Sequence, residues 1–493
     1  MRLRAASVVA IAGILLLPLR AVHAQAPEEL PSSARVPQPE TKPEEKPKTP
    51  QAAAREAKKE EHKPADPDTG SSTLSDETLG LIRNPYAARG IKFSLSYVGE
   101  ALANVAGGLR RGSIYDGRLN AAIDIDFHKL AGWQGLSFHA NVFQIHGPGL
   151  SRHDIGNLIT TSSIEALDTT RLYEMWFEQK FAGDKVSVRA GQLAADTEFI
   201  TSKYTDVFIN ATYGWPTITS INLPSGGPSP PLAAVGARLK ANLTEDVTWL
   251  AAVFNGDPAG PGPGDPQARD RYGVNFRVND PPLVINEIQY AYNHEHGSKG
   301  LPGAIKLGGW YHAGSFNDQR FAANGLSQAD PNASATPAQR HSDFGIYSVF
   351  EQQLLSFPGG DGTRGLGVFT RVSASPSDRN LIDFYADGGF NLAGPFDARP
   401  NDKIGLGLAY ANISNRARDL DRDFQALAAS PRPVRDYEAL VTLGYLMQVR
   451  QGWNLYPTFQ YIVHPGGGYV LDGATPTPVH NATVVGMRTV MKF

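Results

Sequence analysis

The carboxyl-terminal segment of this chain reads as a β-strand that ends on an aromatic residue. Successive side chains of a strand point to opposite faces, so one face here is mostly apolar and the other carries two cations. The first face holds Val485, Met487, Thr489, Met491 and Phe493, and the second holds Gly486, Arg488, Val490 and Lys492. A soluble protein turns such an apolar face to a core, whereas a membrane barrel turns it to lipid and the polar face to a wet lumen. The pattern in the rest of the chain decides between a soluble protein and a membrane barrel.

The amino terminus has the features of an export signal. Arg2 and Arg4 precede an apolar run over 5–19, and Val22-His23-Ala24 has the small-x-small pattern of a cleavage site. The run is too short to cross a bilayer as a helix. We therefore expect residues 1–24 to be a removed signal peptide. With no cysteine in the chain, a lipoprotein anchor, disulfides and thiolate metal sites are excluded.

Charge and composition exclude several classes of protein. Without the signal's Arg2, Arg4 and Arg20, 43 basic residues stand against 49 acidic ones, a net charge of −6 (43 − 49). Such a balance does not indicate a nucleic-acid partner. The sequence has no run of 18 apolar residues, which predicts the absence of a transmembrane helix. The 50 glycines and 36 prolines predict many turns, and 41% hydrophobic residues suits a barrel with a polar interior.

Residues 25–80 differ in composition from all that follows. They contain nine prolines, eight Lys/Arg and twelve Asp/Glu, and the first aromatic residue of the chain is Tyr86. A segment of this kind cannot bury enough apolar surface to offset the entropy of ordering. We expect a disordered periplasmic linker over 25–80, with 52–63 able to form a short helix. Contact with peptidoglycan, or oligomerisation, through this segment is an open alternative.

From about residue 90 onward, apolar and polar residues alternate repeatedly. The clearest segments lie at 119–128, 173–181, 235–242 and 439–449, and as a set they predict strands with lipid on one side and water on the other. A first count of seventeen strands cannot close a barrel with both ends on one side. Placing 272–279 in a connection leaves sixteen, a size that encloses an aqueous channel. The sequence therefore predicts an all-β, transmembrane, antiparallel barrel of 16 strands over 81–493, with 18 strands as the alternative.

The connections between these strands also separate into two groups. The predicted short turns are 130–133, 182–184, 244–246, 295–302, 394–402 and 450–452, and the predicted long connections are 146–169, 196–231, 256–283, 314–341, 414–434 and 465–479. Short periplasmic turns and long external loops are typical of outer-membrane barrels.

Several local strings resemble one family of porins. They are LYEMWFEQ at 172–179, VRAGQL at 188–193 followed by Asp196, Glu198 and Phe199, GWP at 214–216, NEIQYAYN at 286–293, GLPG with GGWYH at 300–312, ADGGF at 386–390 and ARPNDKIGLGLAY at 398–410. Together they resemble the OprB family of carbohydrate-selective porins from about residue 80 to the end. The resemblance implies passive uptake of sugars such as glucose through a monomeric 16-stranded barrel in the bacterial outer membrane. The last strand, ending in Phe493, resembles the signal that the barrel assembly machinery recognises.

Strand parity identifies polar residues that we expect to face the lumen. Such groups could supply hydrogen bonds and aromatic faces to a sugar. The candidates for substrate binding are Glu174, Trp176, Glu178, Arg189, Arg238, Lys240, Glu287, Gln289, Trp310 and Arg371, with His312 beside Trp310. Each of them could instead hydrate the wall and pair across strands. Folded loops at 146–169 or 196–231 could carry the constriction in their place.

Other readings of the chain find less support. The His294-Glu295-His296 string lacks a third ligand at suitable spacing, so neither a metal nor another cofactor is expected. No serine sits in a nucleophile-elbow string, which argues against an enzyme. A general or anion-favouring diffusion porin, without a sugar site, is the alternative function on the same barrel.

Overall fold

The computed structural model describes residues 78–294, 298, 300–358, 363–428, 432–472 and 475–493. All of the described residues belong to one unit of the chain. The predicted signal peptide at 1–24 lies outside the described residues, as does the predicted linker at 25–80 except for its last three residues.

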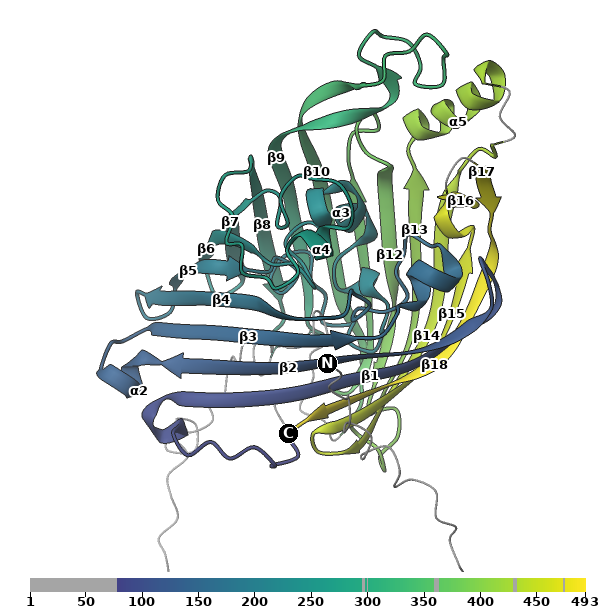
Figure 1. Ribbon diagram of the computed structural model, residues 1–493. Helices are drawn as coiled ribbons and strands as arrows, with labels where there is room; N and C mark the ends of the chain where they lie inside the picture. The colour runs from purple at the N-terminus through teal and green to yellow at the C-terminus, as the bar shows by residue number, and fades with distance from the viewer. Residues whose placement is uncertain (1–77, 295–297, 299, 359–362, 429–431, 473–474) are drawn as a thin grey trace, which may run out of the picture. The chain divides into compact units, whose positions relative to one another are not determined.

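Within the described part of the chain, sixteen antiparallel strands form a closed barrel (Figure 1). Each strand pairs with its neighbour in sequence, and the first strand closes on the last. The barrel strands are β1 (Ile91–Gly108), β2 (Gly112–Asp126), β3 (Leu136–His146), β4 (Thr169–Phe181), β5 (Val186–Leu193), β6 (Ala234–Asn242), β7 (Val247–Asn255), β8 (Pro282–Tyr292), β9 (Gly303–Ala322), β10 (Pro337–Ser356), β11 (Gly365–Ala374), β12 (Ile382–Ala393), β13 (Lys403–Ile413), β14 (Tyr437–Arg450), β15 (Trp453–Val463) and β18 (His480–Lys492).

The strand count of sixteen is confirmed. Two further strands, β16 (Tyr469–Asp472) and β17 (Thr475–Pro478), pair only with each other in the connection between β15 and β18. Residues 272–279 form no strand, as the parity argument requires. An even number of strands brings the start of β1 and the end of β18 to the same end of the barrel.

The two faces of the wall follow the alternation in the sequence. On β18, Met487 is 45% exposed whereas Arg488 is buried at 6%, so the apolar face points outward and the cationic face inward. Leu307 on β9 and Leu408 on β13 are likewise exposed on the outer wall. Exposed apolar side chains in such numbers would be costly in water and are what a lipid-facing surface requires.

The alternation over 173–181 places Tyr173 on the same outward face as Met175 and Phe177, and for Tyr173 this prediction is wrong. The register of β3 with β4 shifts between the pairs Ala140–Met175 and Val142–Leu172, so β4 carries an extra residue there. A bulge of this kind reverses the side-chain parity beyond it. Tyr173 is therefore buried, next to the inward Glu174.

The connections fall largely into the two predicted groups. Short ones at 127–135, 182–185, 243–246, 394–402 and 451–452 lie at the end where β1 begins, and long ones at 147–168, 194–233, 256–281 and 414–436 lie at the other. The long end also includes the tight turn 109–111. The short helical elements are η2 (Ala87–Arg89), α2 (Phe127–Ala131), η3 (Ser151–Ile155), η4 (Ala211–Tyr213), α3 (Thr217–Asn222), η5 (Pro224–Gly226), α4 (Pro266–Arg269), α5 (Asn415–Leu427) and η6 (Pro465–Gly467). Among the described residues, none of these helices has the length and apolarity needed to cross a membrane.

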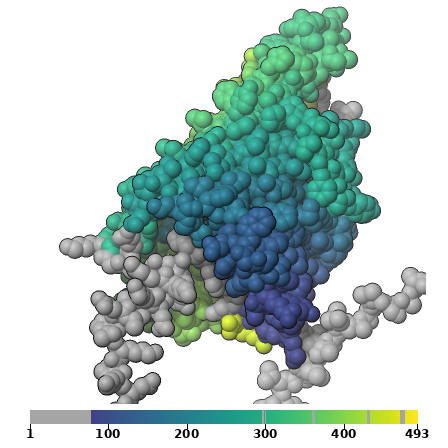
Figure 2. Space-filling model, turned by 90° about the vertical axis from the view of Figure 1, so that its left-hand side faces the viewer, coloured from purple at the N-terminus to yellow at the C-terminus, as the bar shows by residue number. Residues whose placement is uncertain are grey.

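The first described residues and the end of the chain meet at the short-turn end. The backbone N–H of Leu79 donates to the carbonyl of Lys492 (2.7 Å), and that of Phe493 donates to Leu95 (2.9 Å). In Figure 2 the purple residues around the start of β1 and the yellow carboxyl-terminal residues share the lower edge of the molecule. This end therefore has a mouth built partly by both ends of the described chain.

Candidate functional site

The connection between β5 and β6, residues 194–233, folds into the barrel and is called here the constriction segment. Its backbone N–H groups at Ile200 and Lys203 donate to the carboxylates of Glu287 (2.8 Å) on β8 and Glu351 (2.5 Å) on β10. Its Asn210 amide donates to Gln460 (2.9 Å) on β15. The segment therefore crosses the lumen from the wall that it leaves to strands on the far side.

Several of the predicted lumen residues hold this segment in place. Arg371 is fully buried and donates to the carbonyls of Ile200 (3.0 Å) and Thr212 (2.8 Å), while Asp387 on β12 balances its charge. Glu174 accepts the N–H of Ala194 (3.0 Å), where the segment begins. Charged groups make stronger hydrogen bonds than neutral ones, so these contacts fix the path of the backbone.

The far wall is shaped to receive the segment. A Cβ added to Gly444 on β14 would lie 2.4 Å from the carbonyl oxygen of Val207, and one added to Gly407 on β13 would lie 2.3 Å from the Tyr213 hydroxyl. Contacts this short do not occur for real side chains, so only glycine permits the approach. The inward glycines of these strands thus mark where the segment lies against the wall.

A second long connection, 147–168, also turns inward. The carboxylate of Glu438 on β14 accepts the N–H groups of Leu158 (2.8 Å) and Ile159 (2.6 Å). Within the connection, Glu165 accepts N–H groups from Ser151 and Arg152 (both 3.0 Å). Burial raises the pKa of Glu165 above its ordinary value, although these two hydrogen bonds act in the opposite direction.

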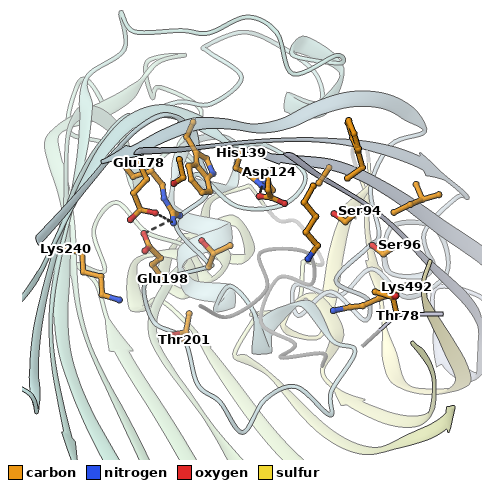
Figure 3. A pocket seen from close by; sticks show the side chains of 18 of the residues that line it. Thr78, Ser94, Ser96, Asp124, His139, Glu178, Glu198, Thr201, Lys240 and Lys492 are labelled. Carbon is orange, nitrogen blue, oxygen red and sulfur yellow. Dashed lines mark hydrogen bonds and ion pairs between the residues drawn. The ribbon is translucent and has the colours of Figure 1, made fainter. Parts of the chain in front are cut away.

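Four charged side chains meet where the constriction segment leaves β5. Glu178 of β4 contacts Arg189 of β5 (3.1 Å) and Arg238 of β6 (2.9 Å), and Arg238 also contacts Glu198 of the segment (2.6 Å). Glu198 and Arg189 are 3.9 Å apart. Figure 3 shows Glu178 and Glu198 directed toward the same cation. These four residues, which we call the charge cluster, have no net charge and present fixed donors and acceptors.

An aromatic side chain lies beside the charge cluster. The guanidinium of Arg189 stands over the ring of Trp176, 3.8 Å from its centroid. The ring of His139 stacks on the same indole at 5.0 Å, and His139 Nδ1 contacts Asp124 (2.7 Å). With these two partners against it the indole is largely buried, and only a small part of its apolar surface reaches the adjacent cavity.

A cavity of about 690 Å³ opens beside the charge cluster toward the mouth at the short-turn end, and we call it the proximal cavity. Its lining includes Trp176, Glu178, Arg189, Lys240 and Gln289, all predicted from strand parity. A separate cavity of about 520 Å³, lined by parts of 147–168, 256–281 and the constriction segment, lies toward the long connections. The segment thus has a water-accessible space on each side.

The structure separates the predicted residues into groups. Trp176, Glu178, Arg189, Lys240 and Gln289 line the proximal cavity, and Arg238 completes the charge cluster behind them. Glu174, Glu287 and Arg371 contact the constriction segment. Trp310 is buried in an apolar cluster that includes Phe199, Ile200 and Trp215.

Sequence reasoning did not include Glu198, Thr201 or Lys306 among the site residues. Glu198 stands in a quoted motif string and in the loop 196–231, which the sequence names as an alternative carrier of the constriction, but strand parity singles out no residue within that loop. One signal was present, because Arg189 and Arg238 are register partners on adjacent strands. Two cations facing each other in this way require carboxylates nearby.

The described residues contain no group of three or more His, Cys, Asp or Glu side chains suited to a metal. In the string considered above, His294 contacts Asp246 (2.9 Å), and Glu295 and His296 lie outside the described residues. A sixteen-stranded barrel with a lipid-type outer wall, a polar lumen and an inward-folded connection is the architecture of an outer-membrane porin.

Comparison with known proteins identifies the family. The sequence profile described as "Carbohydrate-selective porin, OprB family" matches residues 110–493, so the chain belongs to this family. Porin B of Pseudomonas aeruginosa is 25% identical over 423 residues, covering 82% of this chain and 89% of that protein. Putative porin QuiX of Acinetobacter baylyi is 23% identical over 414 residues, covering 80% and 88%. The high-pH structure of Pseudomonas putida OprB superposes with a TM-score of 0.72 at 24% identity, covering 83% of this chain and 95% of that one.

Proposed function

We propose that this carbohydrate-selective porin passes glucose-like monosaccharides by passive diffusion, and that selection takes place where the charge cluster meets Trp176. The observation that carries the proposal is the position of this group. It lies between the strand wall and the inward constriction segment, and it faces the proximal cavity.

The chemistry of the site suits a neutral, hydroxylated solute. Glu178 and Glu198 offer acceptors, Arg189 offers donors, and the two acidic and two basic side chains of the charge cluster balance one another. Hydrogen bonds with charged partners are strong, so a sugar hydroxyl could replace water there. The part of the Trp176 indole that lines the cavity offers a small apolar contact surface. Binding must nevertheless stay weak, because a pore that retains its solute stops conducting.

The other predicted residues then have supporting roles. Glu174, Glu287 and Arg371 would position the constriction segment through the hydrogen bonds described above, and Trp310 would pack beneath it. The Gln289 amide donates a hydrogen bond to the wall carboxylate Glu287 (2.6 Å) and also lines the cavity. In this proposal the anchoring residues affect sugar passage only through the position of the segment.

The proposal also gives roles to the two ends of the chain. Residues 1–24 would direct export and be removed, and 25–80 would form a periplasmic linker able to touch peptidoglycan. The last strand with Phe493 would be recognised by the barrel assembly machinery. Membership of a channel family supports a protein without enzymatic activity.

The test is single-channel conductance of the refolded protein in a planar bilayer, titrated with glucose. We expect concentration-dependent block of ion current, and Arg189→Ala should weaken that block more than it changes the open-channel conductance. Lys185→Ala, an exposed lysine in the turn between β4 and β5, is the control. Conductance indifferent to every sugar would instead support a general or anion-favouring diffusion porin. Unchanged block in Arg189→Ala would remove Arg189 from the site.

A further inference from the structure

The lining of the proximal cavity has an excess of positive charge. Six cationic and three acidic side chains line it: Lys92, Lys180, Arg189, Lys240, Lys306 and Lys492 against Asp124, Glu178 and Glu198. Phe493, which carries the terminal carboxylate, also lines the cavity. The excess is local, because the whole chain is slightly acidic.

The three acidic side chains are already paired. Glu178 and Glu198 contact Arg189 and Arg238 in the charge cluster. Asp124 contacts the imidazole of His139 (2.7 Å) and lies opposite Lys92 in the register of β1 with β2. Carboxylates engaged with partners on their own wall do little to neutralise lysines elsewhere in the cavity, so the positive field of those lysines persists.

Two of the lysines stand near the proposed sugar site without a carboxylate partner. Among the described residues, no carboxylate lies within ion-pair distance of Lys240 or Lys306. The Lys306 ammonium donates to two neutral oxygens of Thr201, the carbonyl (2.6 Å) and the hydroxyl (3.1 Å). Figure 3 shows Thr201 and Lys240 on the same side of the cavity as Glu198. A solute that reaches Trp176 from this side therefore meets two ammonium groups.

We propose that the proximal cavity binds anionic monosaccharides, with Lys240 and Lys306 attracting a carboxylate or phosphate while Trp176 and Gln289 contact the sugar. The inference rests on the proposed function and adds a charge preference to it. A sugar acid or a sugar phosphate can contact both the lysines and the sugar-binding side chains. Chloride can contact only the lysines, and glucose only the sugar-binding side chains. The pore would then pass neutral sugars and hold anionic ones more strongly.

The experiment compares current block by glucose, gluconate, glucuronate and glucose 6-phosphate at about 0.1 M salt, where charges are screened beyond about 10 Å. We expect gluconate or glucose 6-phosphate to block at severalfold lower concentration than glucose. Lys240→Gln should weaken block by the anion roughly threefold, the size expected for an ion pair open to water. Lys306→Gln, whose ammonium is buried and also holds Thr201, should weaken it at least as much. Lys185→Gln removes the same charge from an exposed turn outside the cavity and should change nothing.

The outcomes distinguish the two proposals. Refolding yield and open-channel conductance close to those of the unmodified protein show that the pores of the Lys240 and Lys306 variants are intact. Glucose block without any stronger block by the anions overturns this inference and leaves the sugar site standing. Absence of block by every sugar overturns the proposed function, and with it this inference. Stronger block by phosphate alone, or by carboxylates alone, identifies which anion the lysines recognise.

Discussion

Replacing Arg371 and its partner Asp387 by neutral residues tests whether the constriction segment is held by the wall. Arg371→Gln with Asp387→Asn removes the guanidinium that donates to Ile200 (3.0 Å) and Thr212 (2.8 Å). Both members are changed because an unpaired buried carboxylate at Asp387 would by itself strongly destabilise the barrel. The double variant therefore isolates the attachment of the segment from the stability of the barrel.

The expected size follows from these contacts. A hydrogen bond to a charged group contributes about 1.5–3 kcal/mol, so losing both weakens the inward position by roughly 3–6 kcal/mol. Since about 1.4 kcal/mol is a factor of ten, the detached population should rise roughly a hundredfold or more. The remaining anchors at Glu174, Glu287 and Glu351 should keep part of the segment in place.

Single-channel recording is the assay. We expect a larger mean conductance, frequent current steps as the segment moves, and weaker block by glucose. Arg277→Gln with Asp280→Asn is the matched control, because that bidentate pair (2.8 and 2.7 Å) lies in the connection 256–281. Conductance, current noise and glucose block that all match the unmodified protein would refute the anchoring role of Arg371.

Three further outcomes follow from the structure. Trp176→Ala should weaken glucose block severalfold because the ring that supports the Arg189 guanidinium and lines the cavity is lost, whereas Trp176→Phe should retain much of the block in the same bilayer titration. Burial raises the pKa of Asp402, but hydrogen bonds from Arg399 and Tyr445 outweigh it and hold that pKa below its ordinary value. The resulting stability is present above a pKa of about 3.9 in the unfolded chain and is lost as the pH falls through the lower folded value, so Asp402→Asn should lower the unfolding temperature at neutral pH and not in strong acid. Phe493→Ala should reduce the amount of barrel in the outer membrane while leaving refolding into detergent nearly unchanged; an equal loss in both would argue against an assembly signal.

Much of the wall could be predicted from the sequence because lipid imposes a local rule. Each position that faces lipid must be apolar, independently of contacts with distant parts of the chain. The outward orientation of Met487 and Leu408 could therefore be predicted from the local sequence alone. Tyr173 escaped this rule because a bulge depends on the register with β3, and an aromatic ring suits either face. Parity alone therefore locates strands well and fails where strands are irregular.

The site was less predictable because its geometry depends on a non-local fold. Parity correctly turned Glu287 and Arg371 inward, but what they contact is set by the constriction segment, whose sequence lacks a strand pattern. For the same reason Glu198 was not included in the site. The glycines of the IGLGLAY string could have predicted this contact, since Gly405 and Gly407 leave room for a segment to pack against β13.

The seam between β1 and β18 has a consequence for how the protein is made. Glu100 and Arg488 form an ion pair across this seam, although they are 388 residues apart in sequence. Contacts between such distant residues form slowly, and until they form, both strands are open edges that can pair with other chains. The barrel cannot close before its final residues have arrived in the periplasm. Folding must therefore wait for complete translocation, and the waiting chain requires protection from aggregation until the membrane receives it.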